Sequence, residues 1–65
     1  MKLDTTKIKI LQANHGYTQI DLAKMTGISR QGLNAILQRG TCTPHNLKRI
    51  ADALGVQPIE IVKED

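Results

Sequence analysis

An all-α fold of five short helices is predicted by three observations along this chain of 65 residues. Apolar residues recur at intervals of three and four, as they do on one face of a helix. No segment alternates polar and apolar residues with the period of two that a half-buried strand requires. Glycines stand where four of the helical segments end: Gly16, Gly27, Gly40 and Gly55. Without a linker or repeat, residues 1–65 are expected to form one domain.

The first helix is expected at residues 5–14. Ile8 and Leu11 lie three residues apart and therefore share one face of it. The helix stops at Gly16, because a residue without a Cβ adopts the left-handed C-cap conformation at little steric cost.

Capping residues mark the starts of the second and third helices. Thr18 is a typical N-cap, and Asp21 three residues later resembles a capping box with a shorter acid than the usual glutamate. This second helix ends before Gly27. Ser29 is the expected cap of the third helix, which ends at Gly40. Its apolar side chains point inward: Leu33, Ile36 and Leu37.

The fourth and fifth helices each have a proline near their start. Thr43 followed by Pro44 is a cap with a proline in the first helical position, and Gly55 ends the fourth helix. The apolar residues of this helix follow the i, i+3, i+4, i+7 spacing of a single face: Leu47, Ile50, Ala51 and Leu54. Pro58 begins a short fifth helix. The apolar residues of that helix are Ile59, Ile61 and Val62.

The second and third helices, at about residues 18–38, form a helix-turn-helix. Ala23 supplies a small side chain where the two helices cross, and Gly27 supplies the positive φ that redirects the chain. Larger apolar residues surround the crossing point: Leu22, Ile28, Leu33 and Ile36. When the second helix of such a pair begins with polar side chains, it is suited to a DNA major groove.

The motif combines a glycine turn with a set of apolar and capping residues: Gln19, Leu22, Ala23, Gly27, Ile28, Ser29, Leu33, Ile36 and Gly40. Matching residues flank it: Ile8, Leu11, Thr43, Pro44, Leu47, Ile50, Ala51, Leu54, Gly55, Val56 and Ile61. On these residues the chain resembles the Cro/CI-type (XRE-type, lambda-repressor-like) DNA-binding family. The resemblance implies a compact five-helix domain whose third helix meets base edges.

The chain departs from the family pattern at three places. Thr26 stands where an apolar residue is usual, and it either loosens the turn or places its methyl group inward. Leu37 replaces a frequent glutamate and Gln12 replaces its arginine partner, so that ion pair is expected to be absent. An extra residue before the closing glycine, Gln38 or Arg39, leaves the course of the next loop open.

The resemblance assigns base contacts to the start of the third helix, at Ser29, Arg30, Gln31 and Asn34. Arginine can donate two hydrogen bonds to guanine, and glutamine can pair with adenine. Asn34, one turn further on, fits either a phosphate contact or solvent. Gly32 has two interpretations: it lets DNA approach closely, or a glycine near a helix start is tolerated without a role.

Phosphate contacts are implied at both ends of the motif. They comprise Thr18 and Gln19 at the start of the second helix, and Arg39, Thr41 and Thr43 after the third. Other exposed lysines are expected to contribute only a long-range positive field: Lys7, Lys9 and Lys24.

Composition excludes several classes of protein. The formal net charge of +3, with much of the acid at the C-terminal end, favours a polyanionic partner. No long apolar run or secretory leader is present, so neither a membrane nor secretion is expected and the cytoplasm is the default. Cys42 is a lone cysteine, and with His15 and His45 it lacks metal-ligand spacing. No metal, cofactor or enzyme activity is expected.

The leading hypothesis is a transcriptional repressor that binds double-stranded DNA at a palindromic operator as a homodimer. One helix-turn-helix reads only a few base pairs, and two half-sites about one helical turn apart supply the missing specificity. Ile59 and Val62 are surplus apolar residues that are either singly exposed or paired across the two-fold axis. The alternative is a protein-interaction module with a protein partner, such as an antitoxin or an adaptor of the same fold.

Overall fold

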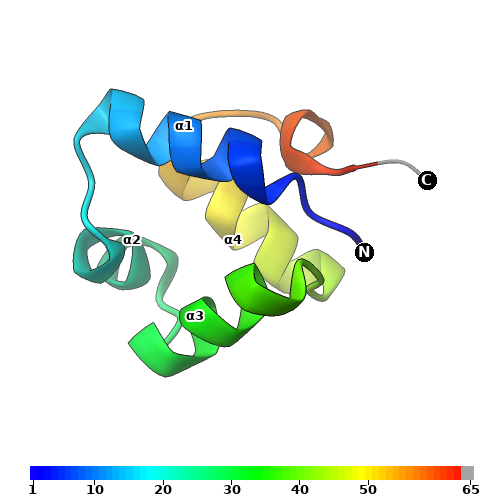
Figure 1. Cartoon of the computed structure of the whole chain (residues 1–65), viewed down its shortest axis with the longest axis horizontal. Helices are drawn as coiled ribbons and strands as arrows, with labels where there is room; N and C mark the ends of the chain where they lie inside the picture. Colours follow the sequence, from blue (N-terminus) through cyan, green and yellow to red (C-terminus); the bar gives the residue numbers. More distant parts are fainter. Residues whose placement is uncertain (64–65) are drawn as a thin grey trace.

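Four α-helices and one turn of 3₁₀-helix form the computed structural model, which describes residues 1–63 (Figure 1). In chain order they are α1 (Thr5–His15), α2 (Gln19–Thr26), α3 (Arg30–Arg39), α4 (Pro44–Leu54) and η1 (Pro58–Ile61). Helix α4 lies at the centre and packs against α1, α2 and η1. The all-α prediction is confirmed, but the fifth element is a four-residue 3₁₀ turn and not an α-helix.

The helix ends follow the expected signals closely. Thr18, Ser29 and Thr43 cap α2, α3 and α4, and each of the four α-helices ends at a glycine with φ between 71° and 73°. The capping box of Thr18 with Asp21 is present. Helix α1 runs one residue beyond its predicted end. The N-cap of α1 is Asp4, which was not predicted. The Asp4 side chain accepts a hydrogen bond from the Lys7 amide at 3.1 Å.

A single apolar core joins all five elements. The largest fully buried side chains are Ile8 of α1, Leu22 of α2, Leu33 of α3, Ile50 and Leu54 of α4, and Ile61 of η1. Burial of one such side chain contributes about 1.5–3 kcal/mol. Leu11 and Leu37 pack against the edge of this core and are only partly buried. Helix α2 is therefore held against α4, and α3 against α2, by the residues that the spacing predicted.

The turn between α2 and α3 is closed by Thr26, which is 5% exposed. Its hydroxyl donates to the Ala23 carbonyl at 3.1 Å and accepts from the Ile28 amide at 3.2 Å. Gly27 adopts φ 73° between these two bonds. The polar residue at this position therefore fastens the turn instead of loosening it.

The end of α1 is fastened by polar contacts. Gln12 donates its amide to the Tyr17 carbonyl at 3.1 Å. The His15 Nε2 lies 2.8 Å from the Leu54 carbonyl, and its ring stacks on Tyr17 with centroids 5.0 Å apart. These contacts attach the α1–α2 turn to the end of α4.

An N-terminal segment, residues 1–4, forms backbone pairs that the sequence did not indicate. Lys2 pairs with Thr41, and Leu3 pairs with Val62, both in antiparallel fashion. Backbone amides donate from Leu3 to Gly40 at 2.7 Å, from Cys42 to Met1 at 3.1 Å, from Asp4 to Ile61 at 2.8 Å and from Lys63 to Lys2 at 3.0 Å. Leu3 is itself buried at 4% exposed. The segment therefore connects the α3–α4 loop, residues 40–43, to the C-terminal residues 61–63.

Candidate nucleic-acid interface

The outward face of α3 carries polar side chains near both of its ends. Each helical residue turns by about 100°, so Leu33 and Ile36, which are buried, leave the opposite side to Gln31, Ala35 and Gln38. All three of these residues are exposed. Within residues 1–63 the Gln31 amide has no hydrogen-bond partner, so both its donor and its acceptor are available. Gln38 was not predicted as a site residue, although its spacing of seven from Gln31 places it on the same stripe.

One flank of α3 faces the start of α2. Gln19 donates its Nε2 to the Asn34 Oδ1 at 3.2 Å. Arg30 lies one turn before Asn34 and is exposed. The structure thus brings a predicted phosphate contact together with two predicted base contacts. The Asn34 amide nitrogen keeps both of its hydrogens as donors, while its oxygen has one lone pair occupied by Gln19.

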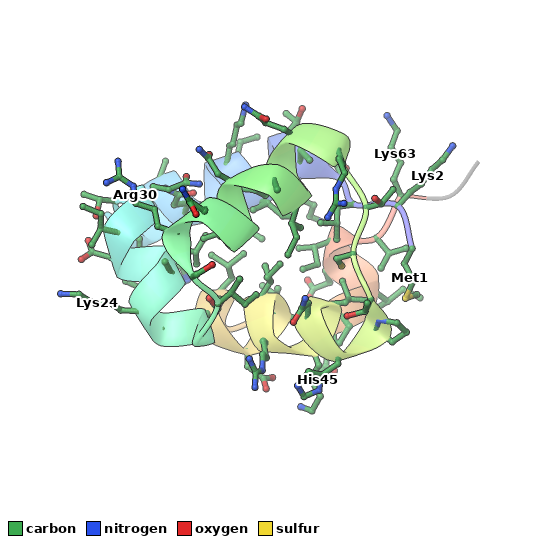
Figure 2. The ribbon with its side chains drawn as sticks, turned by 90° about the horizontal axis from the view of Figure 1, so that it is seen from below. Met1, Lys2, Lys24, Arg30, His45 and Lys63 are labelled. Atoms are coloured by element: carbon green, nitrogen blue, oxygen red, sulfur yellow. The ribbon has the colours of Figure 1, made fainter. Side chains whose placement is uncertain are left out.

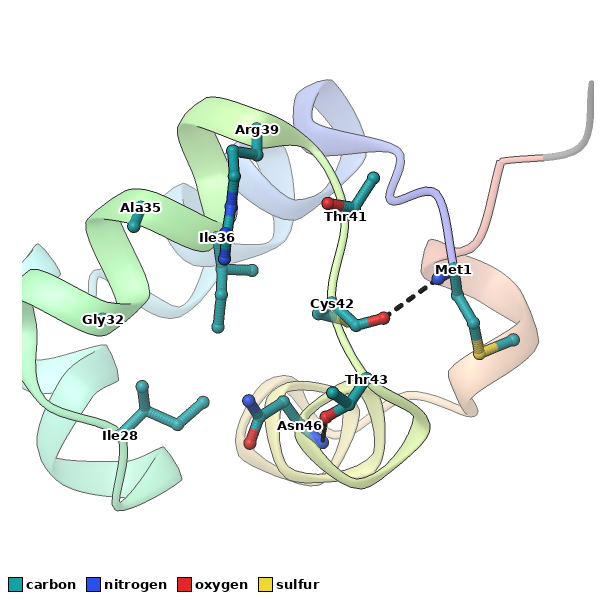
Figure 3. A pocket seen from close by; sticks show the side chains of 10 residues that line it. All are labelled: Met1, Ile28, Gly32, Ala35, Ile36, Arg39, Thr41, Cys42, Thr43 and Asn46. Atoms are coloured by element: carbon teal, nitrogen blue, oxygen red, sulfur yellow. Dashed lines mark hydrogen bonds between the residues drawn. The ribbon is translucent and has the colours of Figure 1, made fainter.

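The other flank of α3 forms a groove of about 490 Å³ against the loop and the start of α4 (Figure 3). Arg39 lies on the α3 side of this groove, while Thr41 and Thr43 line it from the loop. The structure therefore gathers the three predicted phosphate contacts of this region in one place. Asn46, in the first turn of α4, also lines the groove and was not predicted. Its position three residues after the Thr43 cap is the signal that could have revealed it.

The three capping hydroxyls each accept one backbone amide, and only Thr18 also belongs to a capping box. Ser29 accepts from the Gly32 amide at 3.0 Å and Thr43 from the Asn46 amide at 3.3 Å, so each keeps its hydroxyl hydrogen as a donor. Thr18 accepts from the Asp21 amide at 3.1 Å and donates its own amide to the Asp21 carboxylate at 2.9 Å. The backbone amide and hydroxyl of Thr18 lower the pKa of Asp21, which is therefore ionised at neutral pH.

The structure gives a steric explanation for the glycine at position 32 that neither interpretation of the sequence contained. A Cβ at this position would lie 2.9 Å from the Ser29 Oγ and 3.3 Å from the Ile28 Cγ2. The first distance is shorter than real Cβ contacts, so the Ser29 hydroxyl would have to shift to admit a side chain here. Asp21 and Asn46 carry a Cβ at the same position after their own caps, so the glycine relieves a close contact without being required for capping.

Basic side chains lie at both ends of the molecule (Figure 2). Arg30 and Lys24 project from one end, and Lys2 and Lys63 from the other. No acidic residue lies on α3. The ion pair of Lys48 with Asp52, 3.1 Å long, is on the exposed surface of α4. This distribution favours a polyanion across α3.

The two predicted interface residues at the C-terminal end are not equally exposed. Ile59 is 77% exposed. Val62 is half-buried, packs against the core and pairs with Leu3. Ile61 between them is fully buried, as expected for a core position. Ile59 is therefore the larger apolar surface that this end offers.

Neither metal ligands nor a membrane span is found in the part of the chain that the structure describes. Residues 1–63 contain no group of three or more His, Cys, Asp or Glu that could hold a metal ion. His15 is bonded to the Leu54 carbonyl, and burial raises the pKa of the Cys42 thiol. No helix among the same residues is long and apolar enough to cross a membrane.

Comparison with known proteins gives a family match over most of the chain. A family model described as helix-turn-helix matches residues 8–61. This range contains both flanks of α3 and the whole of α2, α3, α4 and η1. No curated protein and no solved structure matches the chain.

Proposed function

We propose that this chain, which belongs to the XRE-type (Cro/CI-like) helix-turn-helix family and is therefore a DNA-binding regulator, is a repressor that occupies a palindromic operator as a homodimer. The observation that supports this most is the exposed polar stripe of α3 with phosphate-binding groups on both flanks. Occupying an operator is enough to exclude polymerase. Repression in the cytoplasm then needs no further surface.

In this proposal the start of α3 reads base edges in the major groove. Gln31 lies at the N-terminal end of the outward stripe and pairs with adenine through its free amide. Arg30 and Asn34 read from the α2 flank, and Ser29 donates its hydroxyl at the helix start. One good bidentate contact contributes about 1–3 kcal/mol of discrimination.

The two flanks contact the two strands of the DNA backbone. Thr18 and Gln19 bind phosphate on the α2 side. Arg39, Thr41 and Thr43 bind phosphate on the α4 side, where Asn46 joins them. These contacts fix the position of α3 in the groove but carry no sequence information of their own.

The homodimer places two copies of α3 about 34–36 Å apart, one helical turn of DNA. Ile59 is the proposed centre of the contact because of its exposure, and Val62 lies at the edge. Pairing across a two-fold axis removes both Ile59 side chains from water.

Selection from a random pool of duplexes, followed by titration across salt, tests the proposal. A palindromic consensus is expected. Gln31→Ala should relax it at one position per half-site, whereas Arg39→Ala should weaken all duplexes alike and reduce the salt slope by about 0.9. Lys48→Ala is the control, since Lys48 is paired with Asp52 on α4. Equal binding of every duplex without enrichment would rule out an operator and favour a protein-interaction module.

A further inference from the structure

A second groove, of about 320 Å³, lies between α1 and the start of α2. We call it the α1–α2 groove, and its lining residues are Lys9, Gln12, Ala13, Tyr17 and Gln19. At about 30 Å³ per water molecule, the volume corresponds to roughly ten waters. The groove is large enough for a phosphate group with part of its hydration shell.

The lining of the α1–α2 groove provides hydrogen-bond donors and one cation. None of the described residues that line it is acidic. Lys9 is exposed and forms no ion pair within residues 1–63. The Tyr17 hydroxyl likewise has no hydrogen-bond partner in that range, and Gln12 keeps one amide hydrogen beyond its bond to the Tyr17 carbonyl. This chemistry suits an anion.

Gln19 connects the α1–α2 groove to the helix that reads DNA. Its side chain lines the groove and also donates to Asn34 of α3 at 3.2 Å. In the proposed complex, a backbone strand that passes the α2 flank of α3 runs along the mouth of this groove. The groove lined by Arg39, Thr41 and Thr43 lies on the other flank of α3, where the other strand would pass.

We propose that the α1–α2 groove binds a second phosphate of the DNA backbone, beside the one at Gln19, with Lys9 as its direct cation and Tyr17 as a hydroxyl donor. This rests on the proposed DNA-binding function and extends its contact surface onto α1. It gives Lys9 a short-range role in place of the general positive field that the sequence suggested.

Lys7 provides a matched control on the same helix. Lys7 and Lys9 carry the same charge and are both exposed. Positions two residues apart on an α-helix differ by about 200° around its axis, and Lys7 does not line the groove. A long-range field would make the two lysines nearly equivalent, whereas a direct contact separates them.

The test measures affinity for the duplex recovered by selection and for a scrambled duplex of the same length, across a range of salt concentrations. Lys9→Ala and Lys9→Gln should each reduce the slope of log affinity against log salt by about 0.9, with a roughly five- to tenfold loss near 0.1 M salt on both duplexes. Lys9→Arg should retain both values. Lys7→Ala should leave the slope unchanged, and Tyr17→Phe should weaken both duplexes less than Lys9→Ala does.

Thermal unfolding of each variant verifies that the fold is retained, which is expected because Lys9 is exposed and alanine favours helix. Equal slopes for Lys9→Ala and Lys7→Ala, with the wild-type consensus intact, would overturn the groove assignment and leave the operator proposal standing. A wild-type chain that selects no consensus would instead overturn the operator proposal.

Discussion

The two flanks of α3 present similar polar groups, proposed above to bind phosphate, but are built in opposite ways. On the α2 side, Thr18 and Gln19 are placed by a capping box whose partners lie three residues apart and by a single hydrogen bond to Asn34. On the α4 side, Thr41 is placed by backbone pairing with Lys2, which is distant in the sequence. The α2 flank is therefore fixed mainly by residues close together in the sequence. The α4 flank depends on chain segments that meet only in the folded domain.

This difference couples the α4 flank to the C-terminal end. The N-terminal segment pairs with the α3–α4 loop on one side and with Val62 on the other. A disturbance at Val62, beside the proposed dimer contact at Ile59, can therefore reach Thr41 through Leu3. Within residues 1–63, no backbone pairing joins the C-terminal residues to the capping box of α2.

The largest expected effect is that of Leu3→Ala, which removes a buried side chain from the segment that positions the α4 flank. Leu3 is 4% exposed and its backbone donates to Gly40 at 2.7 Å. Loss of a buried leucine side chain costs about 2–5 kcal/mol. We expect a large drop in the free energy of unfolding, measured by urea titration, together with a sequence-independent loss of DNA affinity.

Ile10→Ala is the control for Leu3→Ala, because Ile10 is apolar but 56% exposed. It should change the free energy of unfolding by less than about 0.5 kcal/mol. If Leu3→Ala were equally mild, residues 1–4 would not be part of the core and the contrast between the flanks would disappear.

Thr26→Val is expected to have the next largest effect. It acts on the turn between α2 and α3, which is fixed by residues close together in the sequence. Valine keeps the shape of threonine but removes the hydroxyl that bridges the Ala23 carbonyl and the Ile28 amide. Leaving the Ile28 amide without a partner costs about 1–3 kcal/mol. Thr6→Val, at an exposed position of α1, supplies the control in the same chemical denaturation. A Thr26→Val chain more stable than wild type would show that the hydroxyl does not fasten the turn.

The same contrast explains what sequence could and could not predict. The starts of α2, α3 and α4 and the four glycine ends follow from signals within four residues, so they were predicted correctly. Leu3 was missed because its pairing has no period and joins it to residues about forty and sixty positions away. The fifth element was predicted only as a short helix, and the structure shows a 3₁₀ turn, because Pro58 marks the start of either kind of helix equally well.

The candidate nucleic-acid interface shows the same contrast between what is local in the sequence and what depends on packing. Arg39, Thr41 and Thr43 were predicted as one region by resemblance, but the groove that unites them with Asn46 depends on how the α3–α4 loop brings the end of α3 near the start of α4. The proposed role of Lys9 likewise depends on how α1 lies near the start of α2. The shape of neither groove leaves a pattern along the chain.

A smaller effect is expected at the start of α3, where the Ser29 cap and Gly32 also lie close together in the sequence. Gly32→Ala gains about 0.5–1 kcal/mol of helix propensity but displaces the Ser29 hydroxyl, which as a cap contributes about 1 kcal/mol. We expect Gly32→Ala to be near neutral in wild type. In a Ser29→Ala background the same change should stabilise the chain, since the cap is already lost. Equal effects in both backgrounds, measured as a double-mutant cycle by urea unfolding, would remove the steric account of Gly32.

The smallest expected effect is the pH dependence of the α2 cap. The Thr18 backbone amide and hydroxyl, with Lys24 nearby, hold the pKa of Asp21 below its ordinary value, so the folded state favours the ionised carboxylate. This contribution is fully present above the unfolded pKa of about 3.9 and is lost as pH falls through the lower folded pKa. Asp21→Asn should therefore lower Tm slightly at neutral pH and bring the wild-type and variant values together in acid. A constant Tm difference across that range would show that the carboxylate charge contributes nothing to the capping box, and the α2 flank would then depend on its neutral hydrogen bonds alone.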